Sequence, residues 1–117
     1  MTDPPRPELP AFFHRTTTGT EPVLEWLRTL PGEDRRAIGT DLCTVQFGWP
    51  IGMPLCRPLG AGLWEIRTSL PSRRIARLLF FVHQGRIGVV HGFLKTTGKT
   101  PPRDLALARK RMQEMQA

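Results

Sequence analysis

The chain has 117 residues, of which 39% are apolar and 23% charged, and this predicts one domain with a modest hydrophobic core. No apolar run approaches the length of a membrane span, and the proline-rich start "MTDPPRPELP" lacks the apolar stretch of a signal peptide. We therefore expect a cytoplasmic protein without a membrane partner.

The charge is strongly one-sided. The formal net charge is +7 and the pI about 11.0. Residues 1–60 hold 6 basic and 7 acidic side chains, whereas residues 61–117 hold 11 basic and 3 acidic ones. Such an excess is typical of proteins that bind a polyanion, although charge can also serve solubility alone. We favour the polyanion because the basic residues recur at the ends of predicted strands.

The two cysteines, Cys43 and Cys56, form no CxxC pair, and no histidine lies at a zinc-binding spacing from either. We expect two reduced, partly buried thiols, and neither a metal site nor a cofactor.

The first half of the chain predicts a strand followed by two helices. Residues 1–9 are expected to form a flexible arm before a single domain, 10–117. A short aromatic strand is predicted within 10–15, and apolar spacing predicts helices over 23–30 and 34–47. Three prolines and four glycines in residues 48–62 predict a loop.

The second half predicts a three-stranded meander and a last helix. Residues 62–70 alternate between apolar and polar, residues 74–83 are almost continuously apolar, and 86–95 return after a two-residue turn at Gln84-Gly85. A helix follows from Pro101, with a polar side of Arg103, Arg109, Lys110 and Arg111. The expected fold is α+β, in the order β-α-α-β-β-β-α, with an antiparallel sheet packed against helices and strand 74–83 in its middle.

The two-residue turn predicts the pairing of the two strands: the residue numbers of facing residues should add up to 169, so that Arg77 faces Gly92. A guanidinium inside an apolar strand needs an anionic partner. The glycine would leave space for a ligand beside Arg77. A structural salt bridge with Glu65 on the neighbouring strand explains Arg77 equally well.

Four cations, Arg67, Arg77, Lys95 and Lys99, converge on one end of the predicted meander. Such a cluster binds phosphate and stabilises the charge that develops on phosphorus. RNA supplies its own nucleophile, the 2′-hydroxyl, so we expect phosphoryl chemistry without a metal ion.

Few residues are candidates for proton transfer, because the chain has no tyrosine. His91 lies close to the predicted site and histidine exchanges protons near neutral pH, but its predicted face is opposite that of Arg77, which would make it a core residue. Lys95, and after it Lys99, could act as acid or base, or simply contact phosphate. His14 and His83 are expected to be structural or exposed.

Further RNA contacts are expected from basic residues and one aromatic ring. Phe93 could stack on a base or belong to the core, whereas Trp64 is expected in the core. The expected RNA-binding residues are Arg73, Arg74, Phe93 and Arg103.

Three segments in order, "LWEIR" (63–67), "RIARLLFF" (74–81) and "HGFLKTTGKTPPRDLALARKR" (91–111), resemble the phage-derived, HigB-like branch of the RelE/HigB toxins. The resemblance covers roughly residues 10–112. It implies the RelE-like fold and the toxin of a type II toxin–antitoxin module. Such a toxin is an endoribonuclease that cuts mRNA in the ribosomal A site without metal and thereby inhibits translation. The implied partners are mRNA on the ribosome and a HigA-like helix-turn-helix antitoxin.

By position, Arg67, Arg77, Lys95 and Lys99 match the functional cations of that family. The chain departs from the family in two respects: it has no C-terminal tyrosine, and it ends in "RKRMQEMQA" instead of an acid and histidine cluster. The general base therefore stays open. The alternatives are a non-catalytic nucleic-acid or ribosome-binding module and a protein-interaction domain.

Overall fold

A computed structural model describes residues 9–96 and 98–117. Its elements are β1 (Ala11–Phe13), α1 (Pro22–Arg28), α2 (Gly32–Gly48), β2 (Cys56–Gly60), β3 (Leu63–Ser69), β4 (Ile75–His83), β5 (Arg86–Leu94) and α3 (Pro102–Gln116). The α+β class and the order of the elements are confirmed, with one strand, β2, in addition.

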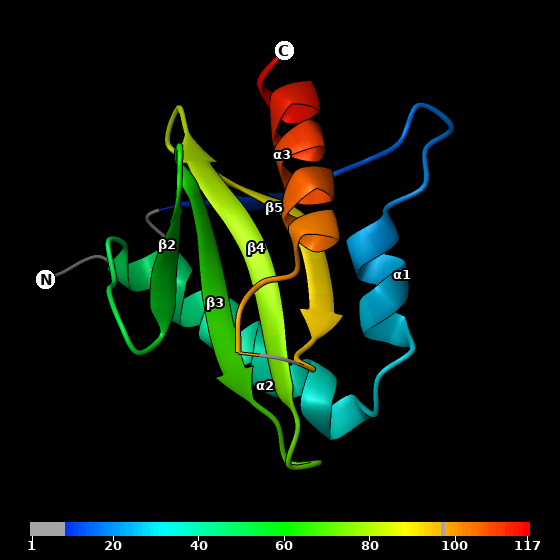
Figure 1. Cartoon of the computed structure of the whole chain (residues 1–117), viewed down its shortest axis with the longest axis vertical. Coiled ribbons are helices and arrows are strands. Elements are labelled where there is room, and N and C mark those ends of the chain that lie inside the picture. Colours follow the sequence, from blue (N-terminus) through cyan, green and yellow to red (C-terminus); the bar gives the residue numbers. More distant parts are fainter. Residues whose placement is uncertain (1–8, 97) are drawn as a thin grey trace, which may run out of the picture.

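The five strands form one sheet in the order β1-β5-β4-β3-β2, and β4 lies in its middle as predicted. β1 pairs with β5 in parallel, and the other neighbouring strands are antiparallel. α3 lies over one face of the sheet and α2 over the other (Figure 1). The larger core cluster joins the sheet to α1 and α2, and the smaller one joins it to α3. None of the described helices is long and apolar enough to cross a bilayer.

The predicted loop 48–62 contains strand β2, so this part of the prediction was wrong. β2 pairs with β3 from Cys56 opposite Ile66 onward, and its register shifts between Pro58 and Gly60. Proline and glycine are rare in central strands, but an edge strand tolerates them because only one side of it must pair. Since β2 is the last strand of the sheet, its composition does not prevent pairing.

The predicted register of β4 and β5 holds only near the turn. Gln84 and Gly85 both have positive φ, +52° and +73°, which suits a two-residue hairpin, and pairing follows the prediction as far as Phe80 opposite Val89. A bulge then shifts the ladder, so that Leu79 faces His91. His91 therefore lies on the same face of the sheet as Arg77, and the prediction of opposite faces was wrong.

The predicted open space beside Gly92 is also absent. Past the bulge Arg77 pairs with Phe93, and Gly92 pairs with Leu78. A Cβ atom at Gly92 would overlap the indole ring of Trp26, which belongs to α1. Gly92 thus allows a helix to approach the sheet, and it leaves no room for a ligand.

Most of the predicted arm, residues 1–8, lies outside the described residues. Leu9, the last residue of the predicted arm, contacts α2: its N–H donates to Gln46 O at 3.2 Å and Gln46 Nε2 donates to Leu9 O at 3.1 Å. His14 is buried and His83 is exposed, as expected for structural or surface residues.

Gly92→Ala should lower the free energy of unfolding by about 1–3 kcal/mol, because the new methyl group forces Trp26 out of its position. Gly39→Ala in α2 is the matched control: nothing lies within 4 Å of its Cβ position, so stability should rise by about 0.5–1 kcal/mol. Urea unfolding of both variants measures the difference, and equal midpoints would contradict the close contact.

Native protein should expose one reactive thiol. Cys43 is exposed and Cys56 is buried, and burial, followed by the charge of Asp41, raises the pKa of the Cys56 thiol to about 11. Because the thiolate is the reactive form, Cys56 should react only after unfolding. Counting modified thiols by mass spectrometry near neutral pH should give one in buffer and two in denaturant, and Cys43→Ser should remove the fast one.

Candidate nucleic-acid interface

Arg77 is held inside the protein by a polar network, although its buried Nε atom makes no hydrogen bond to the described residues. Its side chain and that of Glu65 are 2% and 1% exposed, and Arg77 Nε lies 3.5 Å from Glu65 Oε1. Arg77 Nη2 donates to Gly98 O at 2.9 Å, and Nη1 lies 3.5 Å from Thr100 Oγ1. Thr100 Oγ1 in turn donates to Glu65 Oε2 at 2.7 Å. These contacts join Gly98 and Thr100, which precede α3, to strands β3 and β4.

This contact corresponds to the salt bridge with Glu65, one of the two explanations that the sequence left open for Arg77. Removing two ions from water costs several kcal/mol, and only their mutual attraction and the surrounding hydrogen bonds offset that cost. In this structure the Arg77 guanidinium is enclosed, and its contacts with Gly98 and Thr100 join it to the segment that carries Lys99.

His91 is oriented by a carboxylate. Its Nε2 lies 2.7 Å from Asp104 Oδ1, and the two side chains are 15% and 19% exposed. Asp104 belongs to the first turn of α3, where the helix dipole favours a negative charge. The bulge in β5 brings His91 to this helix, so the geometry provides an imidazole in a fixed orientation, which proton transfer requires.

The remaining predicted cations gather at one end of the sheet. Arg67 pairs with Arg77 across β3 and β4, and Lys95 continues the β5 ladder by donating its N–H to Ile75 O at 2.7 Å. We call this surface the basic end and define it by six side chains: Arg67, Arg73, Arg74, Lys95, Lys99 and Arg103. All are exposed except Lys95, which is partly buried.

One carboxylate of the first half of the chain lies beside the basic end: Asp34 on α2 accepts hydrogen bonds from Ser72 N and Oγ, at 3.2 and 2.7 Å, next to Arg73. Glu65, Asp104 and Glu114, the three acidic residues of the chain after residue 60, face Arg77, His91 and His14 respectively. Among the described residues, none of the four ion pairs involves Arg67, Arg73, Arg74, Lys95 or Arg103. The charges of these five side chains can therefore meet an external anion.

Arg57 is a cation that the sequence prediction missed. It pairs with Glu65 across β2 and β3, is exposed, and shares the sheet face of Arg67. Its position could not be recognised while residues 48–62 were expected to be a loop. With Arg57 the exposed cations extend from the basic end to the edge strand.

The two aromatic residues lie mainly in the core. Trp64 packs against the larger core cluster, where its ring centroid is 4.9 Å from that of Trp49. Phe93 packs partly against the α3 cluster, and its ring centroid is 5.6 Å from that of His91. Phe93 thus remains half-buried beside the candidate histidine.

α3 is fastened to the sheet by two arginines that the sequence suggested were simply polar. Arg109 Nη1 and Nη2 donate to Gly60 O and Leu59 O, at 3.1 and 2.9 Å. Arg111 Nη1 donates to Val90 O, at the bulge, at 3.0 Å. His14 adds a further contact, with its Nε2 2.9 Å from Glu114 Oε1.

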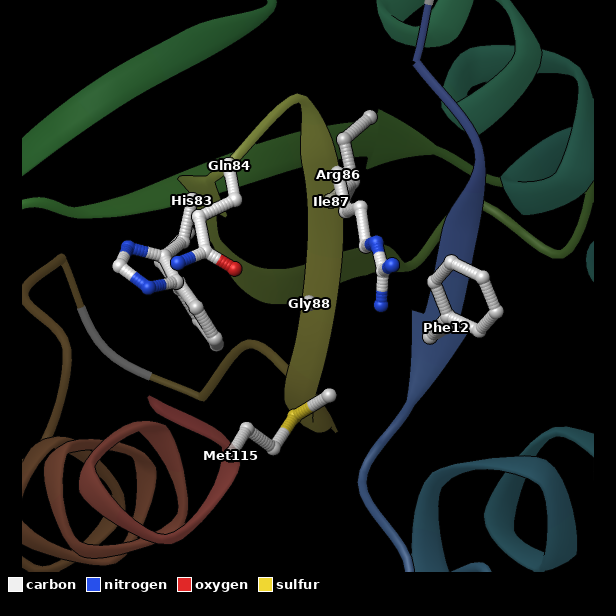
Figure 2. A pocket seen from close by; sticks show the side chains of 8 residues that line it. Phe12, His83, Gln84, Arg86, Ile87, Gly88 and Met115 are labelled. Atoms are coloured by element: carbon white, nitrogen blue, oxygen red, sulfur yellow. The ribbon is translucent and has the colours of Figure 1, made fainter. Parts of the chain in front are cut away.

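A hollow at the opposite end of the sheet contains none of the predicted catalytic residues. Figure 2 shows Phe12, Arg86, Gly88 and Met115 among its lining residues. The Arg86 guanidinium carbon lies 5.5 Å from the centroid of the Phe12 ring, a cation–π contact that occupies this cation. Within the described chain there is also no group of three or more His, Cys, Asp or Glu side chains that could hold a metal ion.

Residues 25–113 match the protein family described as phage derived protein Gp49-like (DUF891). The match covers more than half of the chain. This family comprises toxin-like proteins of the RelE/HigB-type superfamily, and the observed fold is compatible with a RelE-like fold. No curated protein matches the chain.

Arg77→Leu should lower the free energy of unfolding by about 3–5 kcal/mol, because it leaves the Glu65 carboxylate buried without a cation. The double variant Glu65→Leu/Arg77→Leu should recover most of that loss, since no ion then remains inside. Arg67→Leu, the exposed neighbour on β3, should stay within about 0.5 kcal/mol of wild type. Urea unfolding of wild type, Glu65→Leu, Arg77→Leu and the double variant gives the coupling energy, and additive single losses would contradict a paired network.

Proposed function

Since the chain belongs to the phage-derived Gp49-like family, we propose that it is the toxin of a type II toxin–antitoxin module, from the HigB-like branch. We propose that it is a metal-independent endoribonuclease that cleaves mRNA in the ribosomal A site and so inhibits translation. Membership in a toxin-like family implies an antitoxin partner, and we propose a HigA-like helix-turn-helix protein. The observation that carries the activity is an oriented histidine, His91, in a protein whose exposed cations gather at the basic end.

In the proposed reaction the 2′-hydroxyl oxygen attacks the adjacent phosphorus. His91 accepts the hydroxyl proton, with Asp104 holding the imidazole and stabilising its charged form. The bond from phosphorus to the 5′-oxygen breaks, and that oxygen receives a proton from a lysine ammonium, for which Lys95 is our first choice and Lys99 our second. The products are a 2′,3′-cyclic phosphate and a 5′-hydroxyl.

The exposed cations supply the electrostatic part of this proposal. Arg67, Lys95 and Lys99 lie at the surface where a phosphate can approach, and fixed positive charges stabilise a five-coordinate phosphorus more than the starting diester. Arg77 supports them from inside, because it holds Gly98 and Thr100 on either side of Lys99. Arg73, Arg74, Phe93 and Arg103 would extend the contact to flanking nucleotides.

The second candidate is a non-catalytic nucleic-acid or ribosome-binding module that uses the same surface. The burial of Arg77 favours it, because the cation best placed in the middle of the sheet is only 1% exposed. The two candidate functions differ in whether the activity requires the imidazole of His91. A binding module depends on the charges of the basic end and is indifferent to an imidazole.

His91→Asn should reduce mRNA cleavage by about 100-fold or more, since a positioned general base contributes about that much. Lys95→Ala and Arg67→Ala should also abolish most cleavage, while Arg36→Ala on α2 should not. Cleavage is measured on preformed ribosome complexes in a reconstituted translation system, with 3′ ends mapped by primer extension and tested for a cyclic phosphate.

Ribosome binding measured in parallel separates the two candidates. For the nuclease, His91→Asn binds ribosomes like wild type and fails only in cleavage. If wild-type protein binds ribosomes and cuts nothing, the binding module is correct and the nuclease is refuted.

A further inference from the structure

A groove follows the open edge of β5. β1 pairs with β5 only from Ile87 to Val89. Beyond Val89, two adjoining hollows of about 200 and 500 Å³ lie between α3 on one side and α1 with its preceding loop on the other. Arg111 lines both hollows, and we refer to the two hollows together as the groove.

Arg111 has hydrogen-bond donors that the fold does not use. A guanidinium carries five N–H donors, and among the described residues Arg111 makes one hydrogen bond, from Nη1 to Val90 O. Partial burial lowers the pKa of Arg111, and the Glu114 carboxylate opposes this change. A half-buried cation with unused donors is stabilised by an anion that accepts several of them at once, as a phosphate does.

The larger hollow adds two more cations and hydroxyl groups. Lys110 is exposed and takes part in none of the four ion pairs between described residues, and Arg15 is 67% exposed with Nη2 3.5 Å from Glu21. Thr16 and Thr17 line the same hollow. Its carboxylate, Glu114, faces His14 at 2.9 Å, so its charge is partly engaged within the protein.

α3 carries cations of both the basic end and the groove. Arg103, Leu107 and Lys110 are spaced four and three residues apart, which places them along one face of α3. Arg103 belongs to the basic end, and Lys110 lies about 10 Å farther along the helix axis. His91 lines the smaller hollow, between these two groups of cations.

We propose that the groove between α1 and α3, centred on Arg111 with Lys110 and Arg15 at its rim, is a second phosphate-binding site that holds the backbone of single-stranded RNA. This inference rests on the proposed function and adds a path for the strand. The RNA passes from the basic end, past His91, into the groove, so that the reacting phosphate is held from both sides. Held at two points, the strand has less freedom to move away from His91.

The test is binding of a fluorescently labelled single-stranded oligoribonucleotide, measured by anisotropy over a series of salt concentrations. The double variant Arg15→Ala/Lys110→Ala removes two rim charges without touching Arg111, whose bond to Val90 supports the bulge. Arg28→Ala/Arg36→Ala is the matched control, because it removes two exposed positive charges from α1 and α2. Addition of inorganic phosphate at constant ionic strength shows whether the site prefers a free anion to the RNA chain.

The rim variant should bind RNA about tenfold more weakly than the control variant, with a salt slope less steep by about 1.4, since each contact to a single strand contributes about 0.7. Equal affinity and slope for the two double variants overturn the groove site, and so does displacement of RNA by inorganic phosphate alone. If those results accompany loss of mRNA cleavage in Arg67→Ala, the proposed function stands and only the groove fails. If wild-type protein neither binds the oligoribonucleotide nor cuts mRNA, both proposals fail.

Discussion

The arrangement of the candidate interface depends on the buried contact between Arg77 and Glu65. It joins the two central antiparallel strands to the residues before α3, through Gly98 and Thr100. Buried ion pairs are rarely a net source of stability, but they penalise every arrangement in which one partner is left alone. The pair therefore acts mainly as a specificity device, and it keeps the exposed cations of the basic end in one place on the surface.

Buried and exposed cations of the candidate interface have different roles. Arg77 is enclosed and positions the chain, whereas Arg67, directly opposite it in the register, is exposed. Arg109 and Arg111 hold α3 against the sheet through backbone carbonyls, whereas Lys110 between them remains at the surface. Net charge alone thus overstates how many cations can meet a polyanion.

Much of the fold could be predicted because the patterns that specify it are local. The apolar run of β4, the Gln84-Gly85 turn and the two first helices are each visible within a few residues. β2 was missed because Pro58 and Gly60 are typical of loops, although an edge strand tolerates them. The bulge between Val89 and His91 has no local signature, since its carbonyl at Val90 is satisfied by Arg111 on a helix about twenty residues later.

The extra residue at this bulge decides on which face of the sheet His91 lies. Without it His91 would belong to the opposite face, and with it His91 meets Asp104 and shares a face with Arg77. The choice between a ligand and Glu65 as the partner of Arg77 could not be made from sequence either. It depends on how closely the segment around Thr100 covers the strands, and that is a tertiary property.

The parallel pairing of β1 with β5 has a consequence for how the chain folds. Most of the chain separates Ala11 from its partner Ile87, whereas only short turns separate β3 from β4 and β4 from β5. Closing a long loop costs conformational entropy before the contacts that stabilise it can form. Strands β3, β4 and β5 can therefore pair early, and β1 docks late. The first strand then opens at a lower free energy than the centre of the sheet. Its backbone amides are expected to exchange with solvent sooner than those of β4.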